Sequence, residues 1–106
     1  MSLLEQQKAT DHIYALRKEK EMLESFQRLQ TNPDFKKVFL DYYSNSYLVT
    51  LALQKANPFL EEDFAKHLEL KLEAIATFTR FLDNLAVSSD TIDSRLLEAE
   101  LNRSNI

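Results

Sequence analysis

The sequence predicts an all-α fold, arranged as an antiparallel helical hairpin or three-helix bundle with a short C-terminal helix. The chain has no glycine, so it lacks the glycine turns of β-hairpins and most left-handed helix caps. Its apolar residues recur at steps of three and four, which is the spacing of amphipathic helices. Both of its prolines follow an asparagine, as at the start of a helix. We expect a single helical domain over residues 1–106.

The bulk composition excludes several classes of function. A hydrophobic fraction of 44% and a charged fraction of 28% are typical of a globular protein. The net charge of −4 disfavours nucleic acid, because phosphate binding needs a concentrated basic face. The absence of cysteine excludes disulfides, thiolate metal sites and catalytic thiols. No apolar run approaches the roughly 18–20 residues of a membrane span, so we expect no membrane partner.

The first expected helix covers residues 1–31. Its central segment, residues 17–24, mixes charges of both signs, which is typical of a solvated helix face. Lys20 interrupts its apolar stripe. The stripe has helical spacing and consists of Ala9, Ile13, Leu16, Leu23, Phe26 and Leu29.

The second expected helix covers residues 33–56. Asn32 is a favoured cap, Pro33 suits the first helical position, and Asp34 lies where the helix dipole favours a negative charge. Apolar residues follow around much of the circumference of this helix. Such a helix is buried on more than one side, so we expect it to form the centre of the fold.

The third expected helix covers residues 58–86. Asn57 and Pro58 repeat the helix-start pattern, and acidic residues follow in the first turn. The link to the second helix is so short that the two should form an antiparallel hairpin. The apolar stripe alternates steps of four and three with one charged break: Phe64, Leu68, Lys71, Ile75, Phe78, Leu82 and Leu85.

A short acidic helix is expected over residues 90–102. The segment "VSSDTID", residues 87–93, is the only loop-like cluster in the sequence. Ser89 or Asp90 could cap the helix that follows it. Leu96, Leu97 and Leu101 would give this helix an apolar side.

The candidate chemistry is sparse. Asp63 and His67 are spaced i, i+4 and would face each other on one helix, but a surface ion pair is the favoured interpretation. The other histidine is His12. A carboxylate-bridged metal bundle needs Glu-x-x-His motifs on two helices, and none occurs. We therefore predict no catalytic, metal or cofactor site, and the protein is not predicted to be an enzyme.

Residues 57–59 read Asn-Pro-Phe, which matches the short peptide that endocytic adaptor domains bind. That mode of binding needs an exposed turn. Here we expect the tripeptide to open the third helix, with Phe59 as a packing residue.

Surplus apolar surface is the strongest functional signal. Three long helices, one of them apolar on two sides, are hard to cover within one short chain, so association with a second copy or a larger assembly is expected. Tyrosine is enriched at protein interfaces, although core packing is the competing interpretation for each tyrosine. The candidate contact residues are Phe39, Tyr42, Tyr43, Tyr47, Leu96, Leu97 and Leu101.

The segment "LQTNPDFKKVFLDYY", residues 29–43, resembles small proteins encoded in tailed bacteriophage genomes, often near capsid and head–tail genes. The resemblance extends over about residues 22–85. Such proteins usually have a glycine after the aspartate, where this chain has Tyr42. The residues that carry the resemblance are Leu29, Asn32, Pro33, Asp34, Phe35, Asp41 and Tyr43.

The resemblance implies a non-enzymatic structural or assembly component of a virion. Its partners would be itself, other phage structural proteins, or both, and it would be found in the virion or the host cytoplasm. The alternative is a small helical adaptor or inhibitor that binds one bacterial or host protein through the same surface.

Overall fold

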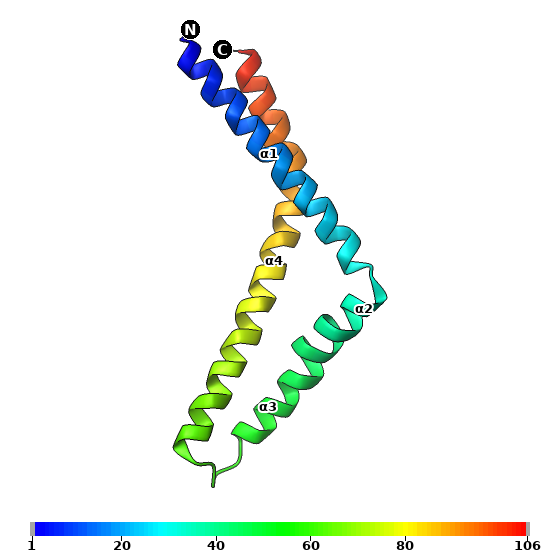
Figure 1. Ribbon diagram of the computed structural model, residues 1–106, viewed down its shortest axis with the longest axis vertical. Coiled ribbons are helices and arrows are strands. Elements are labelled where there is room, and N and C mark those ends of the chain that lie inside the picture. Colours follow the sequence, from blue (N-terminus) through cyan, green and yellow to red (C-terminus); the bar gives the residue numbers. More distant parts are fainter. Residues whose placement is uncertain (1, 106) are drawn as a thin grey trace. The chain divides into compact units, whose positions relative to one another are not determined.

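A computed structural model describes residues 2–105, and within that range every regular element is a helix. The all-α prediction is therefore confirmed. The elements, shown in Figure 1, are α1 (Leu3–Gln30), α2 (Pro33–Phe35), the π-helix η1 (Lys36–Ser46), α3 (Tyr47–Lys55) and α4 (Glu62–Ser104).

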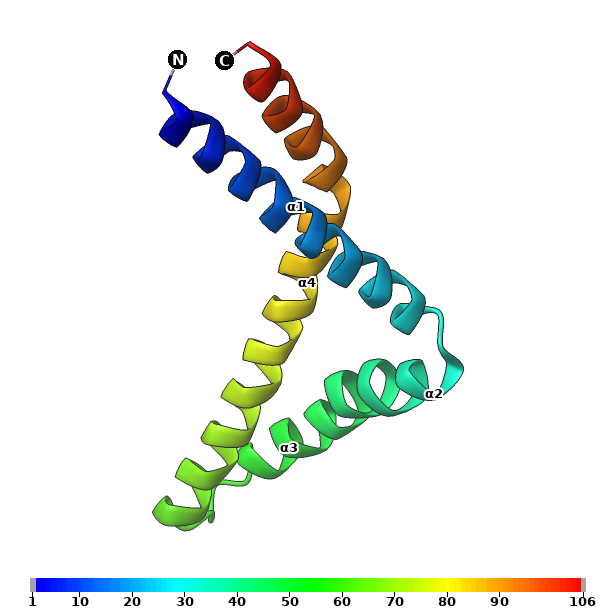
Figure 2. The ribbon, with the colours of Figure 1, turned by 45° about the horizontal axis from the view of Figure 1, so that its top comes forward.

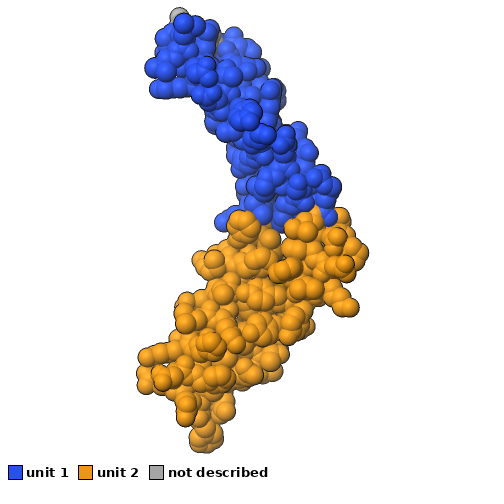
Figure 3. Space-filling view, in the orientation of Figure 1, with its two compact units in different colours: residues 1–28, 84–106 blue, residues 29–83 orange. Residues whose placement is uncertain are grey.

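The chain divides into two compact units, which are coloured separately in Figure 3. Unit 1 comprises residues 1–28 and 84–106, and unit 2 comprises residues 29–83. Each unit has its own apolar core. The expectation of a single domain stays a prediction.

Unit 1 pairs α1 with the last part of α4, and the two lie side by side in Figures 1 and 2. The bounds of α1 agree with the expected first helix. Alternating steps of four and three along both segments bring apolar residues into one seam. The buried core of this unit is Ile13, Leu16, Leu23, Ile92, Leu96 and Ala99, with Leu85 packed against it.

Ion pairs flank this seam and fix its direction. Arg17 pairs with Glu100 at 3.3 Å, Glu19 with Arg95 at 2.9 Å, and Lys20 with Asp93 at 2.7 Å. The partner numbers fall along α4 as they rise along α1, so the two segments run in opposite directions.

The expected break between a third and a fourth helix is wrong, because α4 runs without interruption from Glu62 to Ser104. Ser89 and Asp90 lie inside the helix and cap nothing. The alternation of steps of four and three continues from Leu85 through Ser89 to Ile92, Leu96 and Ala99. With neither proline nor glycine in this stretch, polar residues alone do not end a helix that gains a buried seam on both sides of them.

Unit 2 begins with the expected helix start. The side chain of Asn32 accepts hydrogen bonds from the backbone N–H groups of Asp34 and Phe35, both at 3.0 Å, and Pro33 occupies the first turn. This cap satisfies two donors that would otherwise lack an intrahelical partner. The second helix thus begins where the sequence predicts.

The helix then widens into a π-helix over Lys36–Ser46. Hydroxyl groups follow the same wider spacing: Ser44 donates to the carbonyl of Phe39 at 2.8 Å and Ser46 to that of Asp41 at 3.2 Å, each five residues back. A π-helix turns less per residue than an α-helix, because its hydrogen bonds span five residues. The inward-facing residues fit this geometry, since they recur at every fourth position: Phe35, Phe39, Tyr43, Tyr47 and Leu51.

Residues 57–61 form a turn, so the expectation that Pro58 opens a helix is wrong. The side chain of Asn57 accepts from the N–H of Phe59 at 3.0 Å, and the N–H of Leu60 donates to the carbonyl of Asn57 at 3.4 Å. Asparagine favours such a side-chain-closed turn as readily as a helix cap. Leu60 packs against the core of unit 2. Residues 57–61 therefore stay in the turn, and the helix begins only at Glu62.

The core of unit 2 joins η1 and α3 to the first part of α4. Leu51, Leu68 and Ile75 are buried at its centre, and Lys55 pairs with Glu69 at 3.1 Å. An aromatic group extends the contact, because the rings of Phe39 and Tyr43 lie 5.7 and 5.6 Å from the ring of Phe78.

Candidate functional site

Of the five large apolar side chains of η1 and α3 that are exposed on unit 2, four are at least half exposed and the fifth, Phe39, is 41% exposed. The exposed fractions of the four are 50% for Val38, 57% for Tyr42, 51% for Val49 and 70% for Leu53. They follow one another at steps of four, seven and four, which keeps them within one broad side of a helix. We call these four residues the outer stripe.

The outer stripe exists because this helical run is apolar on two sides. The inner side, with Phe39, Tyr43, Tyr47 and Leu51, meets α4. One neighbouring helix can cover one side only. The run is apolar on two sides, but the expectation that it is buried on more than one side and forms the centre of the fold is wrong, because its second side has no cover within the part of unit 2 that the structure describes.

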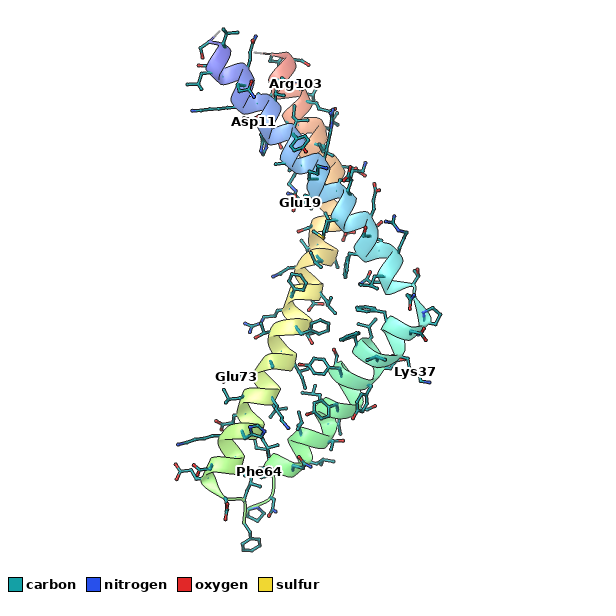
Figure 4. The ribbon with its side chains drawn as sticks, in the orientation of Figure 1. Asp11, Glu19, Lys37, Phe64, Glu73 and Arg103 are labelled. Atoms are coloured by element: carbon teal, nitrogen blue, oxygen red, sulfur yellow. The ribbon has the colours of Figure 1, made fainter. Side chains whose placement is uncertain are left out.

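The outer stripe lies in the least charged part of the chain. Residues 38–54 contain a single charged side chain, Asp41, against 28% charged residues overall. Lys37 precedes this stretch and lies on the side of η1 away from α4 (Figure 4). Lys37 and Asp41 are four residues apart, so their charges largely offset each other locally. The surface is therefore nearly neutral.

A hollow adjoins the end of the outer stripe at the turn between α3 and α4. Its volume is about 440 Å³, and Phe64, labelled in Figure 4, lies beside it. Three apolar and three uncharged polar residues line it: Leu53, Leu60 and Phe64, and Thr50, Gln54 and Asn57. Because it is open and lacks a charged lining residue, it suits an apolar side chain better than a polar metabolite.

Phe59 is 91% exposed, so the expectation that it packs at a helix start is wrong. The residue lies in the turn closed by the side chain of Asn57, which accepts from the N–H of Phe59. The tripeptide Asn57–Phe59 therefore meets the condition set for adaptor binding, an exposed turn.

The structure separates the tyrosines and Phe39 into two groups. Tyr43 and Tyr47 are half-buried against the core of unit 2. Phe39 is exposed at one edge, yet its ring contacts Phe35 and Phe78. Tyr42 lies on the outer stripe and touches Tyr47 with one side of its ring, at 5.7 Å between centroids. Among these four candidates, Tyr42 offers the most surface to a partner.

The leucine candidates of the tail also divide. Leu96 belongs to the buried core of unit 1. Leu97 and Leu101 are exposed one turn apart on α4. The contact role of all seven candidates stays a prediction.

The histidines do not assemble a site. His12 and His67 are exposed, and the ion pair at the first turn of α4 joins Glu62 to Lys66 at 3.5 Å. Within residues 2–105, no three or more His, Asp or Glu side chains are grouped so that they could hold a metal ion. No helix in that range is both long and apolar enough to cross a bilayer.

The sequence analysis did not select Val38, Val49 and Leu53 as contact residues. It favoured aromatic side chains, and most of those lie on the inner side of the same helix. The low charge of residues 38–54 was the signal that could have found them. Comparison of the chain with protein-family models, curated proteins and solved structures finds no match.

Proposed function

We propose that this protein is a non-enzymatic structural or assembly component of a tailed-phage particle, acting through helix-mediated protein contacts. The observation that carries the contact role is the outer stripe, an exposed and nearly neutral apolar surface. Exposed apolar patches of this kind mark interaction sites on soluble proteins. The phage context rests on the resemblance of residues 29–43.

The stretch that carries the resemblance and the outer stripe overlap in one segment of the chain. The resembling stretch contains the cap at Asn32 and runs into η1, where the outer stripe begins at Val38. The cap at Asn32 stabilises the start of the helical run that presents the contact surface.

The proposal includes the finer arrangement expected from the sequence. Its contact element is an antiparallel helical hairpin formed by the two helical runs of unit 2. The three-helix bundle expected from the sequence stays part of the proposal.

The test uses particles from the strain that carries the gene. Mature virions and head precursors are separated on a density gradient, and each fraction is probed with an antibody against the chain. We expect the chain in fixed stoichiometry in at least one kind of particle. Its absence from every particle fraction, while free chain is abundant in the lysate, would refute the assembly role.

An adaptor or inhibitor is the second candidate, and the exposed turn of Phe59 favours it. An aromatic side chain held out on a closed turn is a suitable anchor for a pocket on another protein. A 1:1 complex with one bacterial or host protein, lost in the Phe59→Ala variant but kept in Leu70→Ala, would support this function over assembly.

A further inference from the structure

We propose that the turn at residues 57–61 docks on a different protein, with Phe59 inserted into an apolar pocket whose rim carries lysine or arginine side chains. We call these five residues the aromatic turn. The inference rests on the contact role proposed above, because it names the partner of a second contact surface. That surface lies outside the outer stripe.

The ring of Phe59 is the part of the aromatic turn that a partner would bury. Phe59 is the most exposed large apolar side chain within residues 2–105. Folding therefore buries almost none of this ring, and packing within the chain does not explain its position. Aromatic side chains are frequent anchors of protein interfaces, because they bring a large apolar area to one pocket.

Two hydrogen bonds and a proline hold the backbone of the aromatic turn in one shape. The side chain of Asn57 accepts from the N–H of Phe59 at 3.0 Å, and the N–H of Leu60 donates to the carbonyl of Asn57 at 3.4 Å. Pro58 takes the second position of this four-residue turn, which its fixed φ suits. Leu60 packs against the core of unit 2. A partner would thus bind a ring on an ordered backbone, which reduces the entropy cost of binding.

The charge beside Phe59 specifies the rim of the partner's pocket. Residues 56–65 contain three charged side chains, all of them acidic and exposed: Glu61, Glu62 and Asp63. Glu62 pairs with Lys66 at 3.5 Å, whereas neither Glu61 nor Asp63 forms an ion pair with another described residue. An apolar ring beside two uncompensated carboxylates is complemented by an apolar pocket with a basic rim.

The same acidic charge disfavours the other occupants that an exposed aromatic ring attracts. Nucleic acid and anionic lipid carry negative charge, which the carboxylates would repel. Two copies that met through their aromatic turns would set like charges against each other. A protein with a basic-rimmed apolar pocket is therefore the partner that complements both the ring and the charge.

The first experiment identifies the molecule that contacts position 59. The full chain carries the substitution Phe59→p-benzoylphenylalanine, a photo-crosslinking residue, and is expressed in the strain that carries the gene. Irradiation should link one different protein to this position, through a peptide that contains lysine or arginine. The same substitution at Leu70 is the matched control and should not link that protein, because Leu70 is an exposed apolar residue on α4 of unit 2. The linked protein is then purified for binding measurements.

The second experiment measures binding of the purified chain to that protein. Phe59→Ala should raise the dissociation constant at least about tenfold, the effect of losing a central interface anchor. Leu70→Ala should leave the dissociation constant unchanged. Both side chains are exposed, so circular dichroism should show both variants folded.

The third experiment tests the basic rim with the double variant Glu61→Gln/Asp63→Asn. This variant should lower the association rate constant several-fold at low salt and weaken its dependence on ionic strength, because charges that steer the encounter are lost. The matched control is Glu73→Gln/Asp83→Asn, which removes the same two kinds of charge from exposed positions elsewhere on α4 of unit 2. It should have a clearly smaller effect on the association rate constant.

Four outcomes would overturn the inference: no crosslink at position 59, a crosslink to a second copy, a crosslink to nucleic acid or lipid, or a linked protein whose binding is unchanged by Phe59→Ala or by loss of the two acids. The fate of the proposed function is read separately. A chain that is present in particles but links to nothing at position 59 removes the docking turn and leaves assembly standing. A chain that is absent from all particles but binds a different protein, with both variant effects, does the reverse.

Discussion

The ammonium of Lys20 on α1 lies 2.7 Å from the carboxylate of Asp93 on α4. Lys20 occupies the seam position between Leu16 and Leu23, where the heptad spacing calls for an apolar residue. Its aliphatic stem can cover the seam while the charged end reaches the carboxylate at the rim. The interruption of the apolar stripe is thus accommodated by an ion pair.

Because of this ion pair, the stability of the protein should depend on pH in the alkaline range. The hydrogen bond and charge of Asp93 raise the pKa of Lys20 above its ordinary value of 10.5. A raised folded-state pKa gives a contribution that is complete below the unfolded pKa and is lost as pH rises through the folded pKa. We expect Asp93→Asn to lower the melting temperature at neutral pH, and the difference from wild type to shrink above pH 10.5.

Salt provides the check on that interpretation. The side chain of Asp93 is 77% exposed and that of Lys20 is 41% exposed, so added salt should also reduce the difference between Asp93→Asn and wild type. A difference unchanged by salt and by alkaline pH would mean that Asp93 acts through packing.

Replacing Ser89 with a residue that lacks a hydroxyl group should stabilise the protein. Its hydroxyl oxygen is buried on α4 and has no hydrogen-bond partner among the described residues. An unsatisfied buried hydroxyl costs about 1–3 kcal/mol. Ser89→Ala should raise the free energy of unfolding by about 1 kcal/mol, measured by urea denaturation.

The control for this change is Ser94→Ala on the exposed side of the same helix. Both substitutions improve helix propensity equally. Any larger gain in the free energy of unfolding for Ser89→Ala therefore comes from removing the buried hydroxyl. Equal gains would show that the Ser89 hydroxyl is satisfied in solution.

The continuity of α4 through residues 87–93 can be tested with proline. Proline inside a helix removes a backbone hydrogen bond and clashes with the preceding turn, at a cost of about 3 kcal/mol or more. Ser88→Pro should therefore lower the free energy of unfolding by about that amount and reduce the helical circular dichroism signal. A loop at this position would instead tolerate proline with little effect.

The matched substitution is Glu62→Pro, at the first residue of α4. Proline is favoured in the first turn of a helix, so this variant should keep nearly full stability. Comparable losses in both variants would argue against a single helix from Glu62 to Ser104.

Two adjacent tyrosines should respond differently to truncation. Tyr43 is half-buried, and its ring lies 5.6 Å from that of Phe78 and 6.1 Å from that of Tyr47. Truncation of such a packed aromatic side chain costs roughly 2–3 kcal/mol. We expect Tyr43→Ala to lower the melting temperature clearly, while Tyr42→Ala changes it little and instead lowers the amount of chain found in particles. The reverse order of effects would place Tyr43 at the interface and Tyr42 in the core.

The second helical run shows why sequence patterns identified its existence and start but not its internal geometry. The cap at Asn32 is a local interaction between neighbouring residues, so the sequence alone specifies it. Two residues of the π-helix, Phe39 and Tyr43, contact Phe78 of α4, which is distant in sequence. Steps of four fit either helix type over a few turns, and only packing selects between them.

The two errors at the ends of the predicted third helix have a common cause. Asn57–Pro58 and the serines near residue 88 are local signals that suit several structures. At the first, Leu60 packs into the core of unit 2 and fixes a turn. At the second, Leu85 and Ile92 belong to the seam of unit 1 and carry the helix through.

The sequence by itself determined that this protein is helical, where α1 lies, and how the second helical run begins, because helix periodicity and capping act over a few residues. The tertiary structure decided which side of that run meets α4, and therefore that Tyr43 packs inward while Val38, Tyr42, Val49 and Leu53 face outward. A helix with two apolar sides carries no local information about which side its neighbour will cover. That choice depends on the packing of segments far apart in the chain.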